Sequence, residues 1–212
     1  MVSWSNWSGK QKSNPEEVRF IRSEDDACAT AANPGHSIRV VGTGHSHSAL
    51  VPHDGIIVDV SGLAGVIKVD TDKKSAWVWA GTKIYALGRP LHDAGLALKN
   101  QGDIDQQAIA GACATGTHGT GKDLKNLSSS VLGARVALAS GELLDCSEEN
   151  NWDAWQVSRL SLGALGIATR LQLQLCDACI LKETGFVTSY DELMPDVNRL
   201  IECCGRFAHE TA

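Results

Sequence analysis

The chain has 212 residues, of which 43% are hydrophobic, and a formal net charge of −6 at pH 7. This length suffices for one large domain or for two small subdomains that share a core, and the composition excludes a disordered chain. The acidic balance argues against a nucleic-acid-binding surface. Without an apolar run of ~18 residues or a signal peptide after Met1, we expect no membrane span. The seven cysteines, odd in number and without regular spacing, indicate reduced thiols in a cytoplasmic protein.

The first third of the sequence predicts an arm followed by a strand–helix–strand unit. The arm, residues 1–13, is irregular, and we expect its tryptophans Trp4 and Trp7 to dock on the body of the protein. Ser23 followed by three acidic residues is typical of a helix start, and this helix is expected to run to about residue 33. Strands are predicted at residues 18–21, 38–41, 56–60 and 63–69.

The middle of the sequence predicts a mostly antiparallel sheet with two helices. Trp77 and Trp79 alternate with small apolar residues in one strand, and Ser140-Gly141 has the composition of a hairpin turn. Apolar residues of the segment 82–94 share one helical stripe, which Gly95 ends. A second helix is predicted at residues 151–159. The predicted strands are residues 75–81, 96–99, 131–139, 142–146 and 166–176.

Beyond Cys179 the pattern resets, with a predicted strand at residues 185–187 and a helix at residues 190–204. The whole order of elements predicts an α+β fold with two α/β subdomains, followed by the start of a domain that is too short to form a core. The predicted parts are residues 1–65, 66–180 and 181–212.

A glycine-rich loop at residues 42–48 follows the strand at residues 38–41. Glycine tolerates positive φ and has no side chain to cover the neighbouring backbone N–H groups. Such a loop therefore leaves these groups open to an anion such as phosphate. The dinucleotide-binding fingerprint fails here, because its third glycine is replaced by His47 and Pro52 stands where a helix should run. A Walker loop fails as well, because no Gly-Lys-Ser/Thr follows.

A second segment of small residues runs from Ile109 to Gly121 and contains glycine and threonine at an unusual density. We expect an irregular segment whose backbone approaches a bulky ligand closely, because ordinary core helices and strands avoid this composition. Two such segments from two subdomains could hold an extended dinucleotide between them.

Four motifs together resemble one family, across residues 4–181. The sequence is similar to the FAD-linked oxidases of the vanillyl-alcohol oxidase family, which have a PCMH-type FAD-binding domain. Within that family it resembles the branch of L-gulonolactone, D-arabinonolactone and xylitol oxidases. The motifs are Asn6-Trp7-Ser8-Gly9, Val41-Gly42-Thr43-Gly44-His45-Ser46, Ala110-Gly111 with Thr115-Gly116-Thr117-His118-Gly119, and Gly163-Ala164-Leu165-Gly166-Ile167.

The resemblance implies that FAD lies between the two subdomains, with its pyrophosphate on the N–H groups of the glycine-rich loop. It implies a covalent bond from His45 to the flavin 8α-methyl group, a contact of Ile167 with the adenine, and, from Gly102 beside the flavin, an oxidase. The implied cofactor-binding residues are Gly42, Thr43, Gly44, His45, Ser46, His47, Ser48, Gly102, Asp103, Ala108, Gly111, Ala112, Thr115, Gly116, His118, Gly166 and Ile167.

The resemblance further implies oxidation of a CH–OH group of a sugar lactone, an alditol or a similar small alcohol, of the D-arabinono-1,4-lactone oxidase type. Hydride would pass to flavin N5, and O2 would reoxidise the flavin to give hydrogen peroxide. No catalytic residue is assigned, because the family's C-terminal substrate domain and its His-Trp-x-Lys motif have no match here. A second chain or a further C-terminal part is therefore expected to complete the pocket. The alternative is a non-catalytic flavin-binding subunit of a split enzyme.

Several histidines and cysteines have simpler interpretations. His45 could be a loop histidine that only forms hydrogen bonds, His47 a packing or solvent-facing residue, and His118 a brace of its loop. Cys176 and Cys179 have the spacing of zinc ligands, but the adjacent pair Cys203-Cys204 is a poor partner for them. We therefore predict no metal site.

Overall fold

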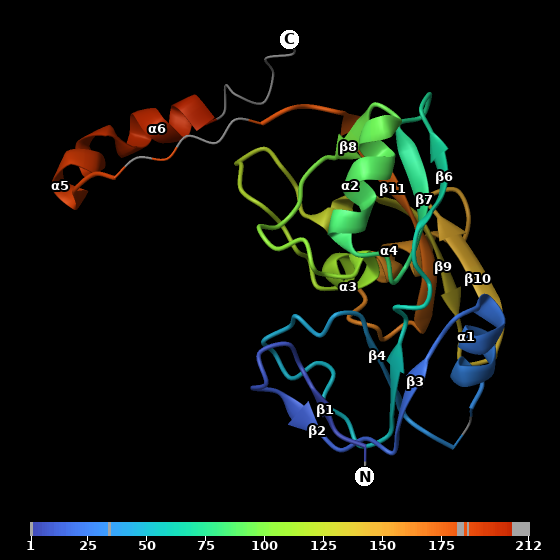
Figure 1. Ribbon diagram of the computed structural model, residues 1–212. Coiled ribbons are helices and arrows are strands. Elements are labelled where there is room, and N and C mark those ends of the chain that lie inside the picture. Colours follow the sequence, from blue (N-terminus) through green and yellow to red (C-terminus); the bar gives the residue numbers. More distant parts are fainter. Residues whose placement is uncertain (1, 34, 182–184, 186, 205–212) are drawn as a thin grey trace.

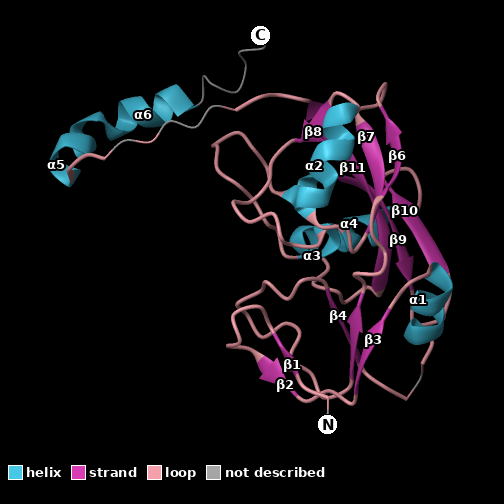
Figure 2. Cartoon of the chain, viewed as in Figure 1, coloured by secondary structure: helices cyan, strands magenta, loops and turns pink. Residues whose placement is uncertain are grey.

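The computed structural model describes residues 2–33, 35–181, 185 and 187–204, apart from the side chains of Cys203 and Cys204. Helices and strands are mixed along the chain (Figure 2), as the predicted α+β class requires. The strands form a two-stranded hairpin, a small parallel sheet and a large antiparallel sheet. In Figure 1 the hairpin and the parallel sheet lie at one end of the molecule and the large sheet at the other.

The parallel sheet contains β3 (Glu17–Phe20), β4 (Ile38–Val41) and β5 (Ile56–Asp59), in the order β3-β5-β4. The central strand β5 begins with three apolar residues, Ile56 to Val58, that are all buried, as expected for a parallel strand covered on both faces. Between β3 and β4 lies α1 (Glu24–Ala31), and the Ser23 hydroxyl caps it by accepting a hydrogen bond from the Asp26 N–H at 3.0 Å. The predicted strand–helix–strand unit is confirmed.

The large sheet has the strand order β10-β9-β11-β7-β6, and β8 pairs with β11 as well. From Ile167 to Cys176 of β11, side chains alternate between buried and partly buried positions, so the predicted long amphipathic strand is confirmed. Gly141, with φ +85°, forms the predicted hairpin turn between β9 and β10. The strands are β6 (Val66–Asp70), β7 (Ser75–Trp79), β8 (Leu96–Leu98), β9 (Val131–Ala137), β10 (Leu143–Ser147) and β11 (Ile167–Asp177).

The predicted start of the strand at residues 63–69 is wrong. β6 begins at Val66 and not at residue 63, because Gly65 has φ +116° and interrupts the extended backbone. Leu63 instead lies buried in the preceding turn, where its N–H donates to the Val60 carbonyl.

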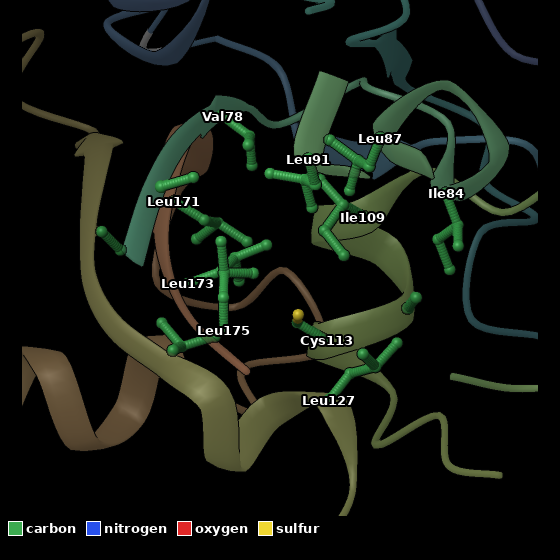
Figure 3. Packing of buried hydrophobic residues seen from close by; sticks show 14 of the residues in the cluster. Val78, Ile84, Leu87, Leu91, Ile109, Cys113, Leu127, Leu171, Leu173 and Leu175 are labelled. Atoms are coloured by element: carbon green, nitrogen blue, oxygen red, sulfur yellow. The ribbon is translucent and has the colours of Figure 1, made fainter. Parts of the chain in front are cut away.

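Three α-helices and a 3-10 helix pack with the large sheet around the main core, shown in Figure 3. They are α2 (Ile84–Asp93), α3 (Ile109–Ala114), α4 (Trp152–Ser158) and the 3-10 helix η1 (Leu127–Ser130). The predicted stripe of α2 is buried, with Ile84, Leu87 and Leu91 exposed by 2% or less. The interpretation of residues 109–121 as wholly irregular is wrong, because its first six residues form α3. Small side chains let this helix pack closely.

A second core lies beside the parallel sheet and includes two residues from the ends of strands in the large sheet, Ala137 and Ile167. The two cores therefore meet at the ends of β9 and β11. Helix α1 contacts these same two strands, although it belongs to the strand–helix–strand unit. The division at residues 65 and 66 stays a prediction.

The C-terminal segment lies apart from the body in Figure 1. The predicted strand at residues 185–187 is wrong at both described positions, which are irregular, and Phe186 lies outside the described residues. The predicted helix is confirmed as three consecutive pieces, α5 (Tyr190–Leu193), η2 (Met194–Asp196) and α6 (Val197–Cys204), of which the first has a capping box from Ser189. Among the described residues, no helix combines the length and apolar character needed to cross a membrane.

Candidate functional site

A cleft with a cavity volume of about 180 Å³, open to solvent at its mouth, lies between the glycine-rich loop and α3. The loop leaves the end of β4 and forms one wall, and residues 107–115 form the opposite wall. Residues 161–168, which lead into β11, close the cleft on a third side. None of the described residues that line the cleft carries a carboxylate, so no negative side chain opposes an anionic ligand there.

The glycine-rich loop is held from behind by the N-terminal hairpin, whose strands are β1 (Trp4–Ser5) and β2 (Lys12–Ser13). Four consecutive loop carbonyls accept hydrogen bonds from the hairpin. The Trp7 N–H binds the Gly44 carbonyl at 3.1 Å, and the Trp7 indole N–H binds the His45 carbonyl at 3.2 Å. The remaining donors are the side-chain amides of Asn6, to Ser46 at 2.9 Å, and of Gln11, to His47 at 3.0 Å.

The same loop has backbone donors left over. Within the described part of the chain, the N–H groups of residues 43–46 donate no backbone hydrogen bond, and these residues line the cleft. Gly44, with φ +68°, supplies the left-handed turn that such a loop needs. A run of open N–H groups is a concave binding site for an anion, so the predicted phosphate-binding character of the loop is supported by its hydrogen bonds.

Thr43 joins the two walls of the cleft. Its hydroxyl donates to the Gln106 carbonyl at 2.8 Å and accepts from the Ala108 N–H at 2.9 Å. The ammonium of Lys83 lies 3.0 Å from the same oxygen. The N–H of Ala108 is therefore already used in a hydrogen bond. Ala108 lines the cleft but does not offer its N–H to a ligand.

His45 lies at the lip of the cleft with its ring stacked on Trp7, at 5.0 Å between centroids and 24° between planes. Burial lowers the pKa of the His45 imidazole, and the positive charge of Lys83 and then His47 lower it further. The ring is therefore neutral at neutral pH, and a neutral imidazole is a competent nucleophile or hydrogen-bond acceptor. His47 lies edge-on to the same Trp7 ring at 5.7 Å.

The structure brings many of the predicted cofactor-binding residues into the cleft. Those that line it are Gly42, Thr43, Gly44, His45, Ser46, Ala108, Gly111, Ala112, Thr115 and Gly166. The others do not line it: His47, Ser48, Gly102, Asp103, Gly116, His118 and Ile167. Ile167 is 2% exposed in the core beneath the cleft, and the His118 ring lies 2.8 Å from the Gly119 carbonyl, as expected of a loop brace.

Several residues of the site lie outside the four motifs, among them Lys83 and Leu162. Lys83 precedes α2, and its pKa is lowered by burial beside the cleft, an arrangement that no local pattern indicates. Leu162 lines the cleft with φ +51° while its side chain stays 54% exposed. A bulky residue in the left-handed region has a strained backbone. The apolar side chain of Leu162 therefore stands at the cleft at a cost in conformational energy. In the sequence, the position of Leu162 directly before the Gly163–Ile167 motif is what could have indicated its place in the site.

A family model described as an FAD binding domain matches residues 16–147, more than half of the chain. L-gulono-1,4-lactone dehydrogenase of Mycobacterium tuberculosis is 42% identical over 174 residues, which cover 81% of this chain and 40% of that protein. L-gulonolactone oxidase of Bos taurus is 31% identical over 200 residues, 93% of this chain and 46% of that protein. The chain thus spans less than half the length of these relatives.

Among solved structures, 6-hydroxy-D-nicotine oxidase of Arthrobacter nicotinovorans superposes with a TM-score of 0.73 at 23% identity, over 82% of this chain and 39% of that chain. That likeness shows the fold. The chain belongs to the FAD-binding domain family of the vanillyl-alcohol oxidase (PCMH-type) fold, with sugar-lactone oxidases and dehydrogenases among its relatives. The cleft fits such a cofactor, because it offers open N–H groups, has a lysine in contact with Thr43 of its wall, and presents no carboxylate among its described lining residues.

Proposed function

We propose that this chain holds FAD in the cleft, with the pyrophosphate on the N–H groups of residues 43–46 and a covalent bond from His45 to the flavin. The observation that carries the proposal is the division of the glycine-rich loop: its carbonyls are engaged by the hairpin and its N–H groups remain open toward a ligand. The neutral ring of His45 stands at the lip of the same cleft. Lys83 adds a positive charge beside Thr43.

With FAD bound, the chain would serve an oxidoreductase that acts on a CH–OH group of a sugar lactone, an alditol or a similar alcohol. FAD supplies the hydride acceptor and the route of electrons to O2, which yields hydrogen peroxide. The residues of this chain bind, orient and shield that cofactor, and we assign no catalytic residue among them. The names of the relatives support the substrate class. A second chain or a further domain would supply the substrate pocket.

The covalent bond has a simple balance. One N–H bond of His45 and one C–H bond of the flavin methyl group would be replaced by one N–C bond. The two protons and two electrons that are released reduce one O2 to hydrogen peroxide. Burial keeps the ring nitrogen unprotonated and hence available for the bond, since the pKa of His45 is lowered.

Acid precipitation tests the covalent bond. We expect flavin fluorescence to stay with the denatured wild-type protein after incubation with FAD, and a tryptic peptide containing His45 to carry the flavin mass. His45→Ala should release all its flavin into the supernatant, whereas the matched variant His47→Ala should retain it. Complete release of flavin from the wild type would exclude the bond.

Anaerobic bleaching separates an enzyme from a binding subunit. If the flavin-loaded chain is complete enough to act, L-gulono-1,4-lactone, D-arabinono-1,4-lactone or xylitol should bleach its absorbance near 450 nm. A second candidate function, a non-catalytic flavin-binding subunit, is favoured by the apolar side chains of Ile180, Leu181 and Val187, which are 94%, 87% and 101% exposed. Bound flavin that dithionite bleaches and no alcohol does would support this candidate.

A further inference from the structure

We propose that Asn6, Trp7 and Gln11 are positioning residues: the N-terminal hairpin orients the peptides of the glycine-rich loop and the ring of His45 for contact with the cofactor. This inference rests on the proposed function of the loop as the FAD site. It adds a role for residues 4–13, which lie outside the part of the chain that the FAD-binding family model matches.

Peptide orientation decides whether this loop attracts or repels phosphate. A peptide that rotates by half a turn replaces an N–H with a carbonyl oxygen, and the loop has little to prevent such rotation because Gly44 adopts φ +68° without a side chain. The hydrogen bonds from Trp7, Asn6 and Gln11 hold carbonyls 44–47 toward the hairpin. Carbonyls 44 and 45 belong to the same peptides as the open N–H groups of His45 and Ser46, so the hairpin fixes the direction of these two N–H groups before any ligand arrives.

Asn6 couples the fold of the hairpin to the loop. Its side chain is 4% exposed in total, and the carbonyl oxygen accepts hydrogen bonds from the Gln11 N–H at 3.0 Å and from the Ser8 hydroxyl at 3.2 Å. Its amide group donates to the Ser46 carbonyl at 2.9 Å. Both ends of one buried amide are used, so closure of the hairpin and the hold on the loop depend on the same side chain.

Trp7 fixes both the main chain and the side chain of His45. The indole N–H holds the His45 carbonyl, while the indole face stacks on the imidazole at 5.0 Å and 24°. Trp7 nonetheless remains 53% exposed, so its burial adds less to the core than that of a buried tryptophan. A large aromatic residue used in this way is more consistent with orientation of its neighbour than with packing of the protein interior.

The test measures how fast FAD attaches to the apoprotein at saturating FAD, by flavin fluorescence of denatured protein. Trp7→Phe keeps a stacking ring and removes the N–H, Trp7→Leu removes both, and Gln11→Ala removes the exposed donor to His47. Because one hydrogen bond contributes about three- to tenfold, we expect Trp7→Phe and Gln11→Ala to slow attachment by that factor. Trp7→Leu should be slower still. Ser5→Ala, exposed on the same hairpin, is the control.

Two further readouts distinguish orientation from stability. The His45 ring protons should show an upfield ring-current shift in the NMR spectrum of the wild type, which Trp7→Phe partly keeps and Trp7→Leu loses, while the melting temperatures of Trp7→Phe and Gln11→Ala stay close to that of Ser5→Ala. Equal attachment rates in all variants would overturn the proposal.

Failure of the proposed function looks different. If the wild type attaches no FAD, the covalent bond is excluded. The positioning role of the hairpin is then tested by the dissociation constant for FAD. A three- to tenfold weaker binding by Gln11→Ala and Trp7→Phe than by Ser5→Ala then supports it, and equal binding overturns it.

Discussion

A methyl group added at Gly42 would lie 2.7 Å from Cβ of Ala108, closer than side-chain carbons approach one another. Gly42 opens the glycine-rich loop and Ala108 directly precedes α3, so the two walls of the cleft touch at this point. Ala108 is 2% exposed and has no free direction in which to move. The width of the cleft is therefore set by the absence of one side chain.

Gly42→Ala should push the two walls apart and weaken FAD binding by about 5- to 150-fold, because the cost of an overpacked contact is about 1–3 kcal/mol. The double variant Gly42→Ala with Ala108→Gly makes room and should recover most of the affinity. Gly88→Ala, in the middle of α2 with nothing within 4 Å of the new Cβ, is the control and should leave binding unchanged. Titration of FAD by fluorescence quenching gives the dissociation constants. Equal weakening in the single and double variants would contradict the steric explanation.

Lys83→Met should raise the pKa of His45 toward its ordinary value. The charge of Lys83 is one of the causes that lower this pKa, after burial. His45 in the folded protein holds its proton less tightly than in the unfolded chain, so its contribution to stability is present above a pH of about 6.5 and is lost as the pH falls below that value. Removal of Lys83 should shrink that loss and shift the His45 NMR titration upward.

Lys68→Met, at an exposed site of the large sheet, controls for the change in net charge. A His45 titration that is the same in both lysine variants would show that Lys83 does not act on the ring.

Glu24→Gln should lower the free energy of unfolding by about 1–3 kcal/mol. The Glu24 carboxylate binds the Arg170 guanidinium in a bidentate manner at 2.9 and 3.0 Å and also accepts from the Thr169 hydroxyl at 2.9 Å. These bonds connect α1 to β11, and the Glu24 side chain is only 18% exposed. Urea unfolding measures the change, and Asp25→Asn on the exposed side of the same turn should cost less. Equal costs would argue against a special role for this carboxylate.

Cys113 should resist alkylation in the folded protein. Burial raises the pKa of its thiol to about 12, so almost no thiolate exists at pH 8. Cys179 is exposed and should react before Cys113. Peptide mass mapping after a short pulse of iodoacetamide, with and without urea, distinguishes the two residues. Modification of Cys113 at the rate of Cys179 would mean that α3 opens readily.

Long periodic patterns predicted the large sheet and α2 well, because burial of one face decides both structures. The alternation of β11 and the stripe Ile84, Leu87 and Leu91 are examples. Helix α3 was missed because its stripe consists of Ile109, Ala112 and Cys113, two of them small. Glycine and alanine in that segment suit close packing as well as ligand contact, and the sequence alone does not distinguish these uses.

The glycine-rich loop was the part of the site that the sequence indicated best, since five successive residues of the predicted set line the cleft. On the opposite wall, the prediction treated residues 109–121 as an irregular segment. The first six residues form α3, and a helix presents only part of its surface to a neighbour. Gly116, with φ +69°, has turned away, and a Cβ there would face Leu160. The role of Lys83 could not be predicted from the sequence, because its contact with Thr43 joins residues 40 positions apart.

The place of β11 in the large sheet has a consequence during protein synthesis. β11 is the last strand of this sheet along the chain and pairs with β7, β8 and β9, all made earlier. Until residue 177 leaves the ribosome, β7 and β9 therefore have open edges that can pair wrongly or recruit a chaperone. Gly166 and Ala168, at the start of β11, also line the cleft. The nascent chain can thus complete its cofactor site only after the start of β11 has been translated.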